Sequence, residues 1–418
     1  MLVIISLLAL LGCVQSAQHK MQLRKITPEM LKMLRKGTWA KYIDGVRKQQ
    51  QHAPRMDGDW KYEHEIIGYS DIEYIGEISI GTPEQNFLVL IDTGTTDLWV
   101  PDKSCYKRPH RPSECQSSQC DPGSICDVFC EEKSCCSLRA NDTTNPCRLK
   151  RRYDMGKSSS YVTTTSRFMI RRKRYVEGFF GRDTIRLGDL VIPNTMFGQA
   201  EKIDSSLVYA HFDGVLGLGC MPGAPLRRAV HLQLLEQPIF TVFLKSIRSE
   251  ENVYGGMITY GGLDLENCEE SVTYEPLADR RAYWQIKLVG VSTGNYHSKI
   301  GWYAESDTGA SLIRGPSAII SAIAKELGAQ YDRLNDLYFI GCDTPAAVNF
   351  TIGTKQYTVG AENLIIKVKE DLCILGLSHW SETDIDAHWL LGDPFIREYC
   401  HIYDLEEKKI GFAKAIQD

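Results

Sequence analysis

The chain has 418 residues, more than one hydrophobic core usually supports, so two lobes or domains are expected. Its content of 43% hydrophobic and 24% charged residues is that of a globular protein and excludes a disordered one. A formal net charge of −5 is small for this length and gives no case for a nucleic-acid partner.

Residues 1–17 have the pattern of a cleaved secretory signal. An apolar run from Leu2 to Leu11 is followed by the small residues typical of a cleavage site. The run is too short to span a bilayer comfortably, although a signal anchor stays open as the alternative. No later segment is long and apolar enough to cross a membrane. The sequence therefore predicts a secretory-pathway protein, extracellular or lysosomal, with no stable membrane anchor.

Residues 18–64 are predicted to be a basic propeptide. Between Lys20 and Arg55 the only acidic residues are Glu29 and Asp44. Thr27-Pro28-Glu29 is a good signal for a helix start, and apolar residues follow in a helical pattern. Two interpretations stay open: a solvated amphipathic helix, or a propeptide whose positive charge neutralises an acidic cleft.

From about residue 65 the chain has the residue pattern of a mainly β protein. Short apolar runs are interrupted by glycine and proline, and helical patterns are few. Two helices are expected, near Ser317–Leu327 and near Pro394–Tyr399. We divide this part into an N-terminal lobe, 65–250, and a C-terminal lobe, 251–418.

Two features occur once in each half, which indicates an internal duplication. One is Asp-Thr-Gly, at 92–94 and 307–309, and the other is two apolar residues and a glycine, at 215–217 and 390–392. Each Asp-Thr-Gly places a carboxylate on a tight turn after a strand. Two such carboxylates held about 3 Å apart cannot both ionise, as is known for aspartic proteases. One then takes a proton from water while the other donates one to a scissile carbonyl group.

Longer motifs in the same order carry a resemblance to a known family. They are Glu73–Gln85, Phe212–Leu218, Gly261–Asp264, Tyr283–Ile286, Trp389–Arg397, and Tyr403-Asp404 with Ile410–Ala413. The chain resembles the pepsin-like aspartic proteases over nearly its whole mature length. The resemblance implies a bilobal β fold with a cleft between the lobes, polypeptide substrates and activity at acid pH. It also implies a monomer with no cofactor and no metal.

The same resemblance assigns roles to individual residues. It makes Asp92 and Asp307 the catalytic pair and Gly94 and Gly309 the turn glycines. Thr93 and Thr308 match the threonines that brace the two turns, and Thr95 matches a hydroxyl residue that bonds the first aspartate. Cys342 and Cys373 match a disulfide of the C-terminal lobe. Asp393, although acidic and near the site, is expected to be structural.

Two departures from the family weaken the expectation of full activity. In the flap hairpin that normally covers the cleft, Arg171 or Arg172 stands where the family has a tyrosine, and Tyr175 substitutes only with a register shift. The run 171–174 is basic, which suits a solvated hairpin, an acidic substrate or partner, or a processing site.

At the second turn Ala310 removes a hydroxyl that would bond Asp307, and Glu305 and Ser306 replace apolar residues. The Glu305 charge either faces solvent or, if buried, perturbs the carboxylate pair. The alternative function is therefore a pepsin-like binding protein with weak or lost catalysis. A structural disulfide module would require both Asp-Thr-Gly turns to be coincidence and is set aside.

The cysteines suit an oxidising compartment. Of 14, Cys13 leaves with the signal, eight crowd into 105–147 and five follow, so the odd total of 13 leaves at least one free or intermolecular thiol. The stretch 105–147 is an insertion relative to compact family members. It has no Cys-x-x-Cys pair, which favours a disulfide-stapled loop of unknown connectivity over a metal site. Asn141 and Asn349 begin glycosylation sequons.

Overall fold

A computed structural model describes residues 17–52, 74–105, 146–147, 150–170, 175–204, 207, 210–246, 253–278, 283–380 and 389–417. The predicted signal apart from Ala17, and much of the Cys-rich insertion including the Asn141 sequon, lie outside these residues. So do the flap positions Arg171 and Arg172.

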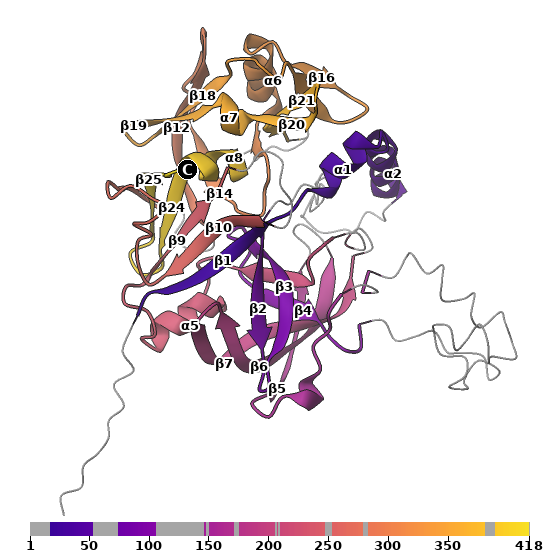
Figure 1. Ribbon diagram of the computed structural model, residues 1–418, viewed down its shortest axis with the longest axis vertical. Coiled ribbons are helices and arrows are strands. Elements are labelled where there is room, and N and C mark those ends of the chain that lie inside the picture. Colours follow the sequence, from indigo (N-terminus) through magenta and orange to yellow (C-terminus); the bar gives the residue numbers. More distant parts are fainter. Residues whose placement is uncertain are drawn as a thin grey trace, which may run out of the picture.

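The chain forms a mostly β structure of two lobes, as predicted (Figure 1). The N-terminal lobe contains β2 (Tyr74–Ile80), β3 (Gln85–Asp92), β4 (Leu98–Pro101), β5 (Val162–Ile170), β6 (Val176–Leu187), β7 (Leu190–Ile203), β8 (Gly214–Gly217), the 3-10 turn Met155–Lys157 and α5 (Pro225–His231). The C-terminal lobe contains β12 (Gln285–Thr293), β13 (Tyr296–Ser298), β14 (Trp302–Ser306), β15 (Ile313–Gly315), α6 (Ser317–Glu326), β16 (Gln330–Asp332), β17 (Leu337–Ile340), β18 (Ala347–Ile352), β19 (Lys355–Gly360), α7 (Ala361–Leu364), β20 (Ile365–Lys369), β21 (Leu372–Leu375), β22 (Leu377–His379), β23 (Trp389–Leu391) and α8 (Asp393–Glu398).

A long sheet joins the two lobes. Its order is β11-β25-β24-β9-β10-β1-β2-β3-β8-β4-β7-β6-β5. The strands not yet given are β1 (His19–Lys25), β9 (Ile239–Leu244), β10 (Val253–Tyr260), β11 (Thr273–Pro276), β24 (Tyr399–Asp404) and β25 (Lys409–Lys414). Strands from both sides of the 250/251 boundary therefore share one sheet, and a cut at that position does not separate two independent sheets.

The first described segment is built into the body of the protein. β1 lies between β10 and β2, antiparallel to both. It leads into α1 (Glu29–Arg35) and α2 (Trp39–His52), which lie beside the C-terminal lobe (Figure 1). The helix start expected at Thr27-Pro28-Glu29 is confirmed, because α1 begins at Glu29. The helices are not simply solvated, since Leu31, Leu34 and Trp39 are buried in a cluster with residues of the C-terminal lobe.

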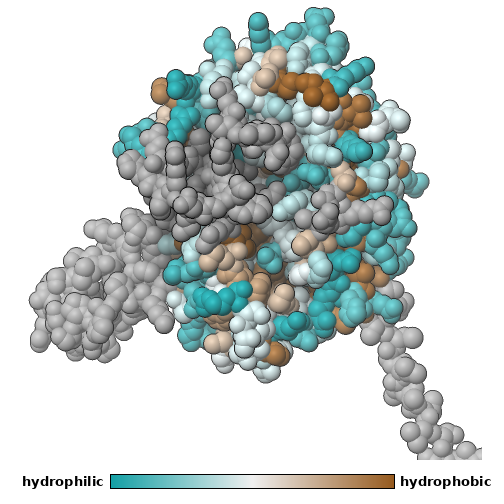
Figure 2. Space-filling model, turned by 180° about the vertical axis from the view of Figure 1, so that it is seen from behind, coloured by the Kyte–Doolittle hydropathy of each residue, from teal (hydrophilic) through white to brown (hydrophobic). Residues whose placement is uncertain are grey.

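The two helices expected in the C-terminal half are also present. α6 and α8 agree with the predicted ranges to within one residue at each end. Side-chain alternation places the apolar residues of the strands inside. The face opposite to that of Figure 1 is mixed, with hydrophilic residues interspersed with smaller apolar patches where it is coloured (Figure 2). Among the described residues, no helix has the length and apolar character needed to cross a membrane.

The structure forms the predicted disulfide between Cys342 and Cys373. It adds Cys268–Cys400, and Cys105–Cys147, which joins the two ends of the Cys-rich insertion. Within the described part of the chain Cys220 is the free thiol, and it is buried. This agrees with the expectation that an odd number of cysteines leaves at least one unpaired.

Candidate active site

The two Asp-Thr-Gly turns occupy equivalent places in their lobes. β3 ends at Asp92 and runs parallel to β8, with Asp92 opposite Gly217. β14 ends at Ser306, one residue before Asp307, and runs parallel to β23, with Ser306 opposite Leu391. The repeated apolar pair and glycine are therefore the neighbouring strand of each turn. This pairing explains why both motifs recur together in the sequence.

Each aspartate is held by its own turn. The Gly94 N–H donates to Asp92 Oδ1 at 2.9 Å, and the Gly309 N–H donates to Asp307 Oδ1 at 2.9 Å. Both aspartates are almost completely buried, at 0% and 1% exposure. A carboxylate that accepts backbone N–H bonds in this way has a fixed orientation and some compensation for its lost hydration.

The two turns brace each other through their threonines. The Thr93 N–H donates to Thr308 Oγ1 and the Thr308 N–H to Thr93 Oγ1, each at 3.0 Å. Each hydroxyl then donates to a backbone carbonyl of the opposite lobe, Thr93 to Ser306 at 2.9 Å and Thr308 to Ile91 at 2.8 Å. The brace predicted for these threonines is thus present and nearly two-fold symmetric.

The brace brings the two aspartates together. A Cβ atom added to Gly94 would lie 2.9 Å from the carboxyl carbon and both carboxyl oxygens of Asp307. The Asp307 carboxyl group therefore lies directly over the first turn, and only glycine leaves room for it there. Two buried carboxyl groups facing one another are the arrangement that shares a proton and activates water.

The Thr95 hydroxyl, which was expected to bond Asp92, does not do so in the described part of the structure. Thr95 Oγ1 is buried, and the described part of the structure gives it no hydrogen-bond partner. The Thr95 carbonyl accepts from the Gly219 N–H at 2.8 Å, so the residue contributes through its backbone. At the equivalent position of the second turn, Ala310 accepts from the Asp393 N–H at 2.9 Å. Asp393 is buried at the start of α8, a placement that suits the structural role expected for it.

The second turn is backed by polar residues. Glu305 is 1% exposed and Ser306 is fully buried, so the solvent-facing alternative for Glu305 is wrong. Ser306 Oγ lies 2.6 Å from both His401 Nδ1 and Tyr403 Oη. Sequence reasoning included Tyr403 only as part of a family motif, and it assigned neither His401 nor Tyr403 a role at this site. The available signal was two polar side chains at alternate positions of β24, which places them on one face of that strand.

The flap is recognisable as the β5–β6 hairpin, whose pairing ends at Ile170 opposite Val176. Tyr175 lies at its end, and its hydroxyl donates to the Glu177 carboxylate. An ion pair with Lys202 and this bond from Tyr175 hold the pKa of Glu177 below its usual value. Trp99, the usual partner of the family's flap tyrosine, is buried nearby in the cluster that includes Val176.

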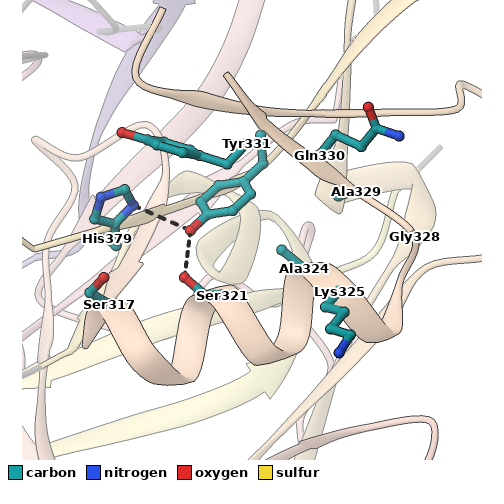
Figure 3. A pocket seen from close by; sticks show the side chains of 10 residues that line it. Ser317, Ser321, Ala324, Lys325, Gly328, Ala329, Gln330, Tyr331 and His379 are labelled. Carbon is teal, nitrogen blue, oxygen red and sulfur yellow. Dashed lines mark hydrogen bonds between the residues drawn. The ribbon is translucent and has the colours of Figure 1, made fainter. Parts of the chain in front are cut away.

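A separate hollow of about 510 Å³ lies on the C-terminal lobe and contains neither aspartate (Figure 3). Its wall includes Tyr331, Tyr338 and His379, whose rings lie 5.1 to 5.8 Å from one another. Tyr338 Oη is hydrogen-bonded to Ser321 Oγ and to His379 Nδ1. The Tyr331 hydroxyl donates to Asp336 instead, so the three rings form an aromatic corner of the hollow.

Comparisons with known proteins agree with this geometry. A family model described as eukaryotic aspartyl protease matches residues 73–415. The chain is 45% identical to aspartic protease 2 of Necator americanus and 32% identical to aspartic protease 6 of Caenorhabditis elegans, in each case over 98% of both chains. It is 32% identical to cathepsin D of Chionodraco hamatus over 84% of this chain and 83% of that protein. The chain belongs to the eukaryotic aspartyl protease family, whose members are peptide-bond hydrolases.

Proposed function

We propose that this chain is an aspartic endopeptidase that is made as an inactive precursor and hydrolyses polypeptides at acid pH. The observation that carries the proposal is the buried pair Asp92 and Asp307 on mutually braced turns. A water molecule between the carboxyl groups would lose a proton to the ionised one and attack the scissile carbonyl carbon. The protonated one would donate to the carbonyl oxygen, so the pair must keep one proton, which favours acid pH.

The precursor part of the proposal is supported by how β1, α1 and α2 are held. Lys20 Nζ lies 2.6 Å from Glu266, and an Arg47 nitrogen lies 3.6 Å from Asp336. Basic residues of the N-terminal segment thus meet acidic residues of the body. Together with the buried Trp39, these contacts support a precursor in which the segment folds with the rest of the protein.

The alternative, a pepsin-like protein that binds peptides with weak or no catalysis, also has specific support. Glu305 is buried close to the second turn, Ala310 offers no hydroxyl, and the Thr95 hydroxyl does not serve Asp92. These features change the surroundings of the carboxyl pair without removing either member.

A peptide-cleavage assay distinguishes the two proposed functions. The proform would be expressed in a secretory host, incubated in acid and assayed on a denatured protein from pH 3 to 7, with and without a statine-type transition-state analogue. Inhibitor-sensitive cleavage that rises toward low pH and disappears in Asp92→Asn supports the peptidase. Asp371→Asn, which changes an exposed aspartate of the C-terminal lobe, is the matched control and should cleave normally. Peptide binding without cleavage by folded, propeptide-free protein supports the alternative.

The secretory origin is part of the same proposal, with an extracellular or lysosomal destination. Asn349 lies on β18, partly exposed, and its Oδ1 accepts from the Thr358 hydroxyl at 2.7 Å. We expect a glycan here and at Asn141. Endoglycosidase treatment of the secreted protein should reduce its mass by less in Asn349→Gln than in the wild type, and an equal reduction would refute the assignment.

A further inference from the structure

Behind the second aspartate lies a closed group of three polar side chains. Ser306, His401 and Tyr403 are each 0% exposed. Ser306 Oγ lies 2.6 Å from both partners, and Tyr403 Oη lies 3.4 Å from His401 Nδ1. Ser306 belongs to β14 of the C-terminal lobe, whereas the other two belong to β24 of the long sheet. The group therefore ties two sheets together directly behind Asp307.

The backbone of Ser306 is held as firmly as its side chain. Its N–H donates to the Trp284 carbonyl at 3.0 Å, and its carbonyl accepts from the Thr93 hydroxyl at 2.9 Å. Ser306 shares a peptide bond with Asp307, so these contacts fix the point from which the carboxylate projects. The Ser306 carbonyl is also one of the two anchors of the threonine brace.

Tyr403 is locked by packing, which gives its hydroxyl a defined position. Its ring stacks on Phe240 with centroids 4.5 Å apart and meets Trp284 edge-on at 5.0 Å. The hydroxyl also has a side-chain hydrogen bond with Thr93, and burial raises the Tyr403 pKa well above its usual value. Tyr403 therefore stays a neutral hydrogen-bonding group throughout the acid and neutral range, in contact with Thr93 and with Ser306.

His401 is likewise kept neutral. Burial lowers its pKa to about 3, and the rings of Phe395 and Phe412 pack against it at 5.5 and 4.8 Å. A neutral imidazole has one N–H and one acceptor nitrogen, which suits a fixed hydrogen bond to a hydroxyl. His401 therefore stays neutral at pH values above about 3.

The residue that precedes the first aspartate is of a different kind. The residue before Asp92 is Ile91, whose buried side chain is apolar and whose carbonyl accepts from the Thr308 hydroxyl. The brace itself is symmetric, so the polar group makes the surroundings of the two aspartates different. Three buried polar side chains cost free energy unless each is hydrogen-bonded, so their joint presence behind Asp307 calls for a role.

We propose that Ser306, His401 and Tyr403 are positioning residues of the active site, which hold the peptide carrying Asp307 from behind and set the placement of its carboxylate against Asp92. The inference rests on the proposed peptidase function. It predicts that loss of the group harms the chemical step rather than substrate binding, because none of the three side chains reaches the surface.

A double-mutant cycle tests the proposal in the acid-activated protein. Tyr403→Phe and Ser306→Ala should each lower kcat about fivefold, the worth of one ordinary hydrogen bond. KM should stay within about twofold, as expected when an interaction matters mainly in the transition state. The double variant should lose no more than about one single variant, because both changes remove the same bond. Tyr357→Phe, at a buried tyrosine on β19, is the matched control and should keep the wild-type kcat.

Unchanged kcat, losses that multiply in the double variant, or an equal loss in Tyr357→Phe would overturn the proposal. A second measurement does not need turnover: the affinity for a statine-type inhibitor and for its analogue without the hydroxyl group. Tyr403→Phe and His401→Leu should weaken the first about fivefold and leave the second unchanged. If the wild type binds this inhibitor but cleaves nothing, the peptidase proposal fails while the inhibitor pair still decides the positioning role. Equal affinities in variant and wild type would refute it.

Discussion

The brace between the two turns makes a quantitative prediction for Thr93→Val. Valine has nearly the same shape, so the change removes hydrogen bonds without opening a cavity. The two shortest bonds that it removes are the one donated to the Ser306 carbonyl at 2.9 Å and the one accepted from the Thr308 N–H at 3.0 Å. Each leaves a buried group unpaired at about 1–3 kcal/mol, so the free energy of unfolding should fall by about 2–6 kcal/mol.

The assay is guanidinium unfolding of the purified proform, with cleavage activity measured on the same preparations. Thr241→Val is the matched control, because Thr241 is equally buried and its hydroxyl donates one bond, to the Gly262 carbonyl at 2.9 Å. The control should lose about half as much stability, about 1–3 kcal/mol, and keep its activity. The reasoning fails if Thr93→Val costs no more than Thr241→Val, or if it leaves kcat intact.

Three further predictions concern the N-terminal segment and the lobe contacts. Trp39→Ala should speed acid-induced separation of the segment, seen by size-exclusion chromatography, since it removes a fully buried ring worth about 3–5 kcal/mol. Glu29→Gln should raise the pH at which the segment separates. A hydrogen bond with His211 holds the pKa of Glu29 below 4.5. The stabilisation that the ionised Glu29 gives is therefore present above pH 4.5 and is lost as the pH falls through the lowered pKa. Cys268→Ser with Cys400→Ser should lower the free energy of unfolding by about 2–5 kcal/mol.

Each of these has its own control. Asp44→Asn breaks an exposed ion pair with Lys48 inside α2 and should not move the separation pH; a shift equal to that of Glu29→Gln would show that general charge loss is responsible. For the disulfide, reductant should destabilise the wild type and leave the double serine variant less affected. Trp39→Phe should separate more slowly than Trp39→Ala, and equal rates would argue against ring burial as the cause.

What the sequence predicted was mostly local. Asp92-Thr93-Gly94 specifies its own turn, because the aspartate accepts from a glycine two residues away. α1 begins at Glu29, directly after Pro28, as the local helix-start signal predicted. The pairing of Cys342 with Cys373 came from family resemblance, and the two lie on neighbouring parts of one small sheet.

What escaped prediction depends on contacts between distant strands. Ser306 meets His401 across 95 residues, and no periodicity in either strand reveals which strand faces it. Cys268 bonds Cys400 because the loop after β10 meets β25 beside β24, a neighbourhood that only the assembled sheet defines. For Thr95 the resemblance gave the position but not the direction of its hydroxyl group, which the surrounding packing decides.

The place of β1 has a consequence for maturation. Its backbone pairs with β10 along its whole length and with β2 at Leu23–Lys25. Its removal would leave two strand edges facing each other inside a continuous sheet, each with unpaired N–H and C=O groups. A single cut between residues 52 and 74 would leave this strand hydrogen-bonded in place. Under the proposed maturation, the product is either a two-chain protein that keeps its first strand or the result of a strand exchange, and the mass of the acid-treated protein under native conditions distinguishes them.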